Sequence, residues 1–403
     1  MYKRQADTRL LPGSARELIG AMLHPMNAPV FDKNRVVVSG HGLIHPRMDV
    51  ELPSAVKTPF SRVMAGSGGT DPYGASCGEV WMDLTDRGGF AGKGILDVDA
   101  LLRGCSDLPE NLILSHDAIE GAILRGGYMS DTELTDGFPS NPGAYFRRQH
   151  RWVRGDWQNI GFIFKRGRNF AFADRWKLFD SLRRSLCAPF CLAALIWALA
   201  VPAAASLCAG LLALLSLCTG VLPALGTALL RRDRERLHSA TPHGLTGRLL
   251  QMLLRLALLP WEAFVSLSAI WLALWRMAIS KRNLLAWQTA AQSEGRARKW
   301  LEPWPVAVTG LALLIFSPAP AGRAFGLAWL IAVLIVPRLG RPKKNVPPLP
   351  EADRRFLLGE ASKIWAYFAA FCAPEDNYLP PDNWQEQPPT GLAHRTCLLY
   401  TSD

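Results

Sequence analysis

An acidic cluster at residues 115–121 holds the side chains best suited to acid–base chemistry in this chain. Asp117 stands at the predicted start of a helix, where the helix dipole favours an ionised carboxylate. Such a carboxylate can accept a proton from a sugar hydroxyl. Glu120 lies three residues further on, so it can share a helix face with Asp117. The competing interpretation is that both are ordinary acids of a first helical turn and that His116 only orients or supports them.

A second cluster, at residues 148–157, places arginines every three residues beside two tryptophans. The residues are Arg148, Arg151, Arg154, Trp152 and Trp157. Arginines near one helix face can clamp a diphosphate, and an indole can carry a sugar ring on its face. The same composition is expected of a cationic helix at a membrane surface. The cluster alone therefore leaves both interpretations open.

Two weaker candidates precede these clusters. In the glycine-rich stretch at residues 90–94, Gly92 and Gly94 flank Lys93 and would let the backbone approach a sugar closely. A plain loop explains this stretch more simply. Asp7 is a candidate metal carboxylate, although one aspartate near the start of the chain carries little information by itself.

Composition predicts a soluble domain followed by a membrane region. The 403 residues carry a net charge of +11 and are 49% hydrophobic, but residues 185–340 are far more apolar than residues 1–180. Many basic residues flank the apolar runs, as cytoplasmic loops do. These basic residues lie within 231–236, 281–282, 296–299 and 338–344. Because no basic stripe is interleaved with aromatic residues in the soluble part, nucleic acid is not an expected partner.

The eight cysteines are scattered and form no CxxC pair, so no zinc site is expected. We expect all eight to be reduced, which fits a cytoplasmic soluble domain.

Residues 1–180 alternate short apolar stretches with glycine and proline, which predicts an α/β domain. Strands are expected at 35–40 and at 43–44, the second ended by Pro46. Helices are expected at 15–23 after a Ser14 cap, at 99–103, and up to residue 124 after a Ser115 cap.

The apolar region is expected to contribute about four transmembrane helices. Residues 186–230 exceed one span of roughly 20 residues and suit a hairpin that turns near Pro202. Residues 304–336 suit a second hairpin that turns at 317–323.

The stretch at residues 249–279 is harder to assign, because Arg255, Pro260 and Glu262 interrupt it and basic loops flank both ends. A helix in the membrane interface or a re-entrant pair is favoured over a single span. After a proline-rich linker, residues 351–373 predict an amphipathic helix.

The order of these motifs resembles that of the processive family 2-like glycosyltransferases, a GT-A-fold group that includes cellulose synthase. Longer strings are more similar still to the glycosyltransferase region of bacterial cyclic β-1,2-glucan synthases. These strings lie at 71–73, 92–99, 114–121, 150–157 and 280–292. Residues 379–396 resemble the opening of a glycoamylase-like domain, so that 351–396 would be the start of such a domain.

The resemblance implies a role for each matched residue. Asp117 would be the general base, and Asp7 would belong to the Asp-x-Asp motif that binds Mg²⁺ or Mn²⁺. Arg151 and Trp152 would contact diphosphate and acceptor. The remaining substrate-binding residues would be Arg148, Gly92, Lys93, Gly94, His116 and Glu120. The implied donor is UDP-glucose, and the implied acceptor is a β-1,2-glucan that grows by processive, inverting transfer.

Two positions depart from the cellulose synthase pattern, since Gln5 replaces the first aspartate of Asp-x-Asp and Arg148 replaces a glutamine. The nucleotide-binding units expected before Asp7 are missing. The resemblance therefore predicts a fragment: a partial GT-A-like domain over 1–180, membrane helices over 185–340, and a truncated third domain. Such a fragment is expected to be inactive alone.

The expected location is the bacterial inner membrane, with several spans in the lipid bilayer and the catalytic domain in the cytoplasm. Two alternatives remain open. One is a different β-glucan synthase of the cellulose-like kind, and the other is an inactive membrane remnant.

Overall fold

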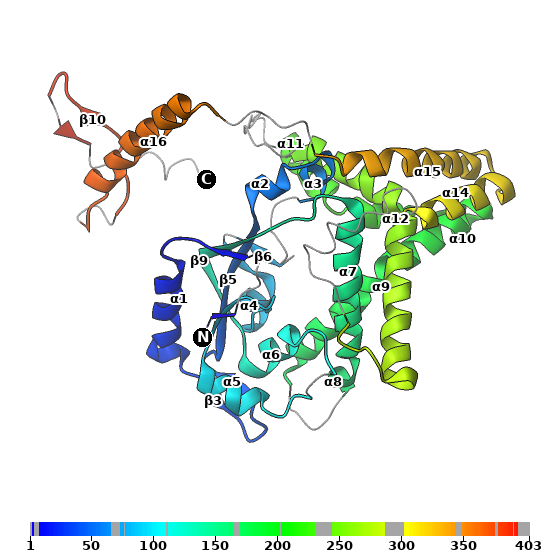
Figure 1. Cartoon of the computed structure of the whole chain (residues 1–403), viewed down its shortest axis with the longest axis horizontal. Coiled ribbons are helices and arrows are strands. Elements are labelled where there is room, and N and C mark those ends of the chain that lie inside the picture. The colour runs from blue at the N-terminus through cyan, green and yellow to red at the C-terminus, as the bar shows by residue number, and fades with distance from the viewer. Residues whose placement is uncertain are drawn as a thin grey trace. The chain divides into compact units, whose positions relative to one another are not determined.

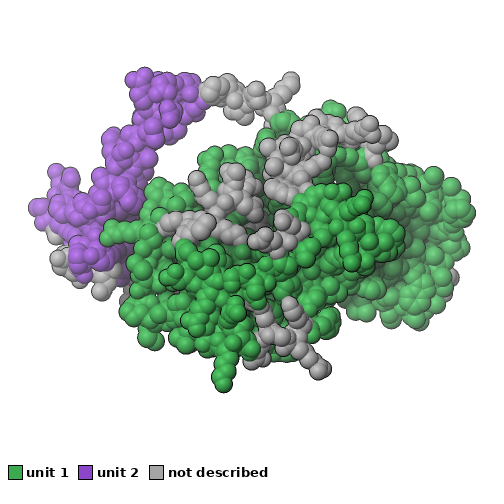
Figure 2. Space-filling model, turned by 60° about the horizontal axis from the view of Figure 1, so that its bottom comes forward, with its two compact units in different colours: residues 1–343 green, residues 344–403 purple. Residues whose placement is uncertain are grey.

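The computed structural model divides into two compact units, residues 1–343 and residues 344–403 (Figure 2), and each is described by itself. The described residues are 2–3, 8–65, 73–75, 77–109, 112–164, 170–201, 203–230, 244–286, 302–342, 349–374, 378–389 and 391–393. Several predicted features lie outside them, namely Gln5, Asp7, the 71–72 part of the 71–73 string, and the basic runs at 231–236 and 296–299.

A five-stranded mixed sheet forms the centre of the soluble part of the first unit (Figure 1), in the order β1-β8-β5-β9-β2. The strands are β1 (Tyr2–Lys3), β8 (Gly94–Leu96), β5 (Leu43–Val50), β9 (Gly127–Asp136) and β2 (Thr8–Leu10). Strands β5 and β9 are parallel, and the other neighbours are antiparallel. This sheet, with the helices around it, confirms the predicted α/β class.

Strand β5 is longer than the sequence indicated, because it continues through Pro46 to Val50. The register with β9 shifts between Pro46 and Arg47. Proline, which cannot donate a ladder hydrogen bond, is tolerated at such irregularities. The strand expected at 35–40 is confirmed in a shorter form as β4 (Val37–Ser39), which pairs with β3 (Val30–Phe31).

Helices cover both faces of the sheet. Alternate residues of β5 face opposite sides, so Ile44 packs with Leu18 of α1 (Ser14–Leu23). Leu43 packs in a second cluster with residues of α5 (Val98–Cys105) and α6 (Asp117–Leu124). The start of α6 is thereby fixed at one edge of a buried core.

Two expected helix caps are wrong. The Ser14 hydroxyl donates to the Glu133 carbonyl oxygen at 3.4 Å, and α1 begins at Ser14 itself. The N-cap of α6 is His116, whose side chain caps nothing, and Ser115 precedes it. In each case the serine hydroxyl has a different partner, because a tertiary acceptor or a nearby carboxylate competes for it.

Longer helices follow the sheet domain. They are α7 (Pro142–Gln158), α9 (Phe172–Ala200), α10 (Ala204–Leu217), α11 (Val221–Leu230), α12 (Gly244–Trp275), a π-helical turn (Arg276–Ser280), α14 (Trp304–Phe316) and α15 (Pro320–Leu339). Helices α7, α9 and α12 pack together (Figure 1). Within the described residues, α9, α12 with its π-helical turn, and α15 are long and apolar enough to cross a membrane.

Both apolar stretches expected to turn back on themselves do so, as α9–α10 and α14–α15. The Ser317 hydroxyl, after α14, donates to the Leu199 carbonyl oxygen near the end of α9 at 2.8 Å, which ties the two turns together. The first stretch differs in one respect, since α10 ends at Leu217 and a separate helix, α11, follows. That these helices cross a bilayer remains a prediction.

Helix α12 is continuous through Pro260, so the re-entrant pair considered for this stretch is not formed. In its most apolar 18-residue window 56% of the residues are buried, against 28% in α9 and 22% in α15. Trp261 of α12 packs on Phe146 of α7, with ring centroids 4.6 Å apart. Helix α12 is thus the most buried of the three long apolar helices, and it packs against α7 as well as against α9, α14 and α15.

The remaining short elements of the first unit connect these layers. They are a 3₁₀ turn (Pro25–Asn27), α2 (Leu52–Ala55), α3 (Pro59–Met64), β6 (Gly74–Ala75), β7 (Gly78–Glu79), α4 (Val80–Thr85) and α8 (Ile160–Phe164). The second unit contains α16 (Glu351–Phe371) and a small hairpin, β10 (Trp384–Gln385) with β11 (Gly391–Leu392).

Candidate functional site

The carboxylate of Asp117 lies directly against the backbone of Gly92. Gly92 has a φ of 79°, which favours glycine, and a Cβ built on it would lie 2.7 Å from both carboxylate oxygens. The glycine-rich stretch therefore has a specific function here, because any side chain at Gly92 would displace the carboxylate. Asp117 itself is partly exposed at the first turn of α6.

Ser115 supports the same carboxylate, since its hydroxyl donates to Asp117 Oδ2 at 3.0 Å. Helix α7 holds Ser115 in place. Asn159 Nδ2 donates to the Ser115 carbonyl oxygen at 3.3 Å, and a Cβ on Gly155 would come within 3.2 Å of Ser115 Cβ. The Arg/Trp helix and the acidic cluster are thus brought together, as the sequence suggested.

Gln158, at the end of α7, links two chain segments that are far apart in sequence. Its Oε1 accepts from the Leu114 amide at 2.7 Å, and its Nε2 donates to the Leu284 carbonyl oxygen at 3.2 Å. Arg154 binds the same segment, because its guanidinium donates to the carbonyl oxygens of Leu284 at 3.0 Å and Ala286 at 2.9 Å. The chain leaving α12 is therefore fixed beside the Asp117 segment.

This use of Arg154 corrects the expectation of a three-arginine diphosphate clamp. Arg154 is 5% exposed and donates to protein carbonyls. Arg151 precedes Gly155 by four residues and Arg148 precedes it by seven, so both lie near the face of α7 that meets Ser115. Arg151 is the nearer of the two along the helix, one turn or about 6 Å before the Ser115 contact.

Arg148 and Trp152 form a pair near the middle of α7. The Arg148 guanidinium carbon lies 4.8 Å from the Trp152 ring centroid and 5.1 Å from that of Phe138. Such a cation–π contact orders both side chains. Trp152 remains 36% exposed, which leaves part of its indole accessible.

Two other predicted residues lie around the start of α6. His116 Nε2 is 3.1 Å from the Ile113 carbonyl oxygen, which is a local contact that shapes the turn into the helix. Glu120 follows Asp117 by one turn and is partly exposed. This arrangement agrees with an orienting role for His116.

Lys93 does not face Asp117. Its ammonium forms a buried ion pair with Asp136 at the end of β9, and Asp136 also accepts from the Thr8 hydroxyl at 2.7 Å. Gly94 lies in β8 with a φ of 155°, where a Cβ would collide with the Ile44 carbonyl oxygen. Of the three residues expected at the acceptor end, the structure places Gly92 against Asp117, whereas Lys93 and Gly94 stabilise the sheet.

The expected metal site is not assembled by the part of the chain that the structure describes. Asp7 lies outside the described residues, and among those described no three or more His, Cys, Asp or Glu side chains are grouped to hold a metal ion. No chemical step is therefore assigned to Mg²⁺ or Mn²⁺.

Four residues of this site were missed or misassigned from the sequence: Ser115, Gly155, Gln158 and Asn159. Gly155 lies inside the Arg/Trp cluster, and Gln158 and Asn159 follow it directly, in the run Arg154-Gly155-Asp156-Trp157-Gln158-Asn159. A glycine followed by amide side chains at a helix end is the one signal that could have marked them.

Comparison with known proteins gives one informative match, while no family model matches the chain. Over an alignment of 420 residues, covering 97% of this chain, it is 32% identical to the cyclic beta-(1,2)-glucan synthase NdvB of Rhizobium meliloti (strain 1021). The chain spans 14% of the length of that curated relative. The resemblance drawn from the motifs is thereby confirmed, since the chain matches a segment of that cyclic beta-(1,2)-glucan synthase over nearly its whole length.

Proposed function

We propose that this chain is the sugar-transferring segment of a membrane-bound glucan synthase, which transfers glucose from UDP-glucose to a growing β-1,2-glucan by processive, inverting transfer. The observation that carries the proposal is the placement of Asp117. Its carboxylate lies against the Gly92 backbone and accepts from the Ser115 hydroxyl, and the segment that carries it is held by α7, the helix of Arg151. The named activity of the matched relative supports the same assignment.

In this proposal Asp117 is the general base. It takes the proton of the acceptor hydroxyl while that oxygen forms a bond to the anomeric carbon of glucose. The bond from this carbon to the diphosphate breaks with inversion, and UDP leaves with the electron pair. Arg151 offsets the negative charge on the departing diphosphate. Trp152, with Arg148 ordering its ring, carries a glucose unit on its exposed face.

The proposed location is the bacterial inner membrane, with the sheet domain on the cytoplasmic side. The three long apolar helices support a membrane protein, and the basic residues around the apolar runs favour a cytoplasmic side for the loops that carry them. The proposed partners are UDP-glucose, a β-glucan acceptor and the lipid bilayer.

Because the fragment is expected to be inactive alone, the test uses a full-length synthase that contains this segment, in membrane vesicles with radiolabelled UDP-glucose and a β-1,2-gluco-oligosaccharide acceptor. We expect labelled product with β-1,2 linkages from the unaltered protein, and no product from Asp117→Asn although this variant still binds UDP. A product with β-1,3 or β-1,4 linkages would instead support the cellulose-like alternative. A chain that neither binds UDP nor transfers glucose would contradict the proposal and support the inactive-remnant alternative.

A further inference from the structure

The segment that carries Gly92 is anchored to the first long apolar helix. We call residues 87–94 the glycine loop. At its start, the Arg87 guanidinium donates to Asp174 Oδ2 at 2.8 Å and to the Val37 carbonyl oxygen at 3.3 Å. Asp174 stands in the first turn of α9 and is 1% exposed. A carboxylate so deeply buried requires paired cations, and its two partners determine where the loop begins.

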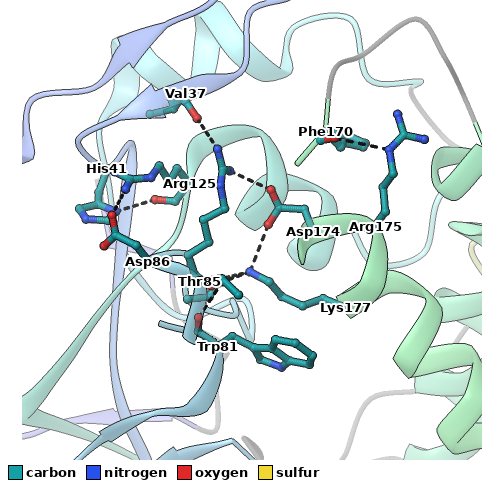
Figure 3. Close-up of polar contacts among 12 residues, drawn as sticks. Val37, His41, Trp81, Thr85, Asp86, Arg125, Phe170, Asp174, Arg175 and Lys177 are labelled. Atoms are coloured by element: carbon teal, nitrogen blue, oxygen red, sulfur yellow. Dashed lines mark hydrogen bonds and ion pairs between the residues drawn. The ribbon is translucent and has the colours of Figure 1, made fainter. Parts of the chain in front are cut away.

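Lys177, one turn further along α9, completes this anchor (Figure 3). Its ammonium lies 3.1 Å from Asp174 Oδ1 and donates to the carbonyl oxygens of Arg87 at 2.7 Å and Gly88 at 3.0 Å. Two of its N–H donors thus bind backbone carbonyl oxygens of the loop, while its charge is paired with Asp174. Lys177 therefore binds the backbone of the loop as well as Asp174. An ion pair that only held the loop and α9 together through their side chains would not need these backbone hydrogen bonds.

The rest of the glycine loop is held at short intervals up to the candidate base. The Gly88 amide donates to the Gly126 carbonyl oxygen at 2.7 Å. A Cβ on Gly121 of α6 would lie 3.0 Å from Phe90 Cβ, so loop and helix are in close contact there. Two residues later, Gly92 meets the Asp117 carboxylate. Four residues separate the Lys177 contact at Gly88 from Gly92, a span of at most about 14 Å.

We propose that Asp174 and Lys177 are positioning residues for the transfer reaction. They fix the start of the glycine loop to α9, so that Gly92 holds the Asp117 carboxylate at a set position relative to the first long apolar helix. This inference rests on the proposed function, in which Gly92 and Asp117 meet the acceptor. A displacement of α9 would then reach the base through the loop.

The expected consequence is selective for the acceptor. Loss of the anchor leaves the cations of α7 in place, so donor binding is retained. The acceptor hydroxyl and Asp117 lose their alignment, and small misplacements of reacting groups are costly. A purely structural role would instead lower the amount of folded protein, which reduces the apparent kcat for donor and acceptor alike and leaves both KM values unchanged.

The test compares Lys177→Met and Asp174→Asn with Arg183→Gln in a full-length synthase that contains this segment, in vesicles. Arg183 lies on the same helix and pairs with Asp180, and its more exposed side chain (53%) makes it a control for the loss of a charge from α9 outside the anchor. For the two anchor variants we expect kcat/KM for the acceptor, per mole of folded protein, to fall by about tenfold or more, while the donor KM stays close to that of the control. Because each anchor variant leaves a buried charge with fewer partners, its melting temperature should fall below that of the control.

Two outcomes would overturn the inference. One is an acceptor kcat/KM equal to that of Arg183→Gln, and the other is a parallel loss of donor binding, acceptor binding and folded protein. Hydrogen exchange of the peptide at 87–94 supplies a readout that does not depend on activity. We expect faster exchange in Lys177→Met than in Arg183→Gln, and equal exchange would contradict the anchor. If the unaltered chain transfers no glucose, the proposed function fails while this exchange test still decides the anchor.

Discussion

Gly92 and Lys93 are neighbours in the chain, yet they face two carboxylates with opposite properties. Gly92 lies against Asp117, which is partly exposed at the first turn of a helix and accepts from the Ser115 hydroxyl. Lys93 is paired with Asp136, which is 3% exposed and is the last residue of strand β9. One short motif thus supplies both a contact to the candidate base and a stabilising ion pair of the sheet.

The difference shows what separates a reactive carboxylate from a structural one. A base must exchange a proton with a substrate, so one side of its carboxylate has to remain accessible. The Gly92 backbone and the single Ser115 hydroxyl contact Asp117 and still leave it partly exposed. A buried carboxylate needs a cation and further donors around it, and these partners exclude a substrate. Mutations of the two groups should therefore affect activity and stability separately.

The largest effect is expected for Asp117→Asn. General base catalysis contributes about 10²–10⁴-fold to a rate, so glucose transfer should fall by that factor. Because the carboxylate is partly exposed, the melting temperature should stay within a few degrees of that of the unaltered chain. Initial rates with labelled donor and a thermal unfolding curve measure both. A large drop in melting temperature would show that Asp117, like Asp136, stabilises the fold, and it would contradict the distinction between the two carboxylates.

The second effect concerns stability. Lys93→Met leaves Asp136 buried without its cation, which should lower the free energy of unfolding by about 3–5 kcal/mol. The double variant Lys93→Met/Asp136→Leu replaces the pair by apolar groups and should recover much of that loss. Denaturant unfolding of the three proteins measures this. If the single variant is as stable as the unaltered chain, Lys93 is not a structural cation.

The third effect concerns Gly92, which lies against the Asp117 carboxylate. Gly92→Ala forces a side chain into the space of the Asp117 carboxylate, so transfer should fall by up to about 10²-fold. The positive φ adds a stability cost of about 1–2 kcal/mol. Gly94→Ala is the matched variant, because it disturbs the pairing of β8 with β5 and should lower stability more. If Gly92→Ala and Gly94→Ala lost the same activity and had the same stability, Gly92 would have no specific role beside Asp117.

Much of this site followed from local sequence. The helix start at Asp117, the cluster on α7 and the glycines were identified because each belongs to one short segment with a recognisable pattern. The α/β class and the two helical hairpins followed from the same kind of pattern. The contact of Gly92 with Asp117 was expected only in general terms, as a close backbone approach near the substrate.

The roles of Lys93 and Arg154 could not be predicted in this way. Lys93 finds its partner 43 residues away at the end of β9, and Arg154 finds its acceptors about 130 residues away, after α12. Local sequence shows two cations in promising motifs but does not show which carboxylates or carbonyls the fold brings to them. The Ser14 cap failed for the same reason, since the distant Glu133 carbonyl oxygen accepts from its hydroxyl, whereas the Ser115 hydroxyl binds the carboxylate of nearby Asp117.

The smallest effect concerns His150, on the helix that carries Trp152. Burial, reinforced by the charges of Arg154 and Arg276, lowers the pKa of His150 to about 4. An unfolded histidine titrates near about 6.5, so below that pH only the unfolded state takes up the proton. Stability should therefore be highest above about pH 6.5 and decline as the pH falls toward 4.

His150→Gln removes this proton uptake, so its unfolding free energy should depend less steeply on pH between about 6.5 and 4 than that of the unaltered chain. Denaturant unfolding at several pH values in this window measures the two slopes. Parallel slopes would show that His150 takes up its proton in the folded state as readily as in the unfolded state. The His150 side of α7 would then be accessible to solvent. The contrast between the partly exposed Arg148–Trp152 pair and a buried face with His150 and Arg154 would not hold.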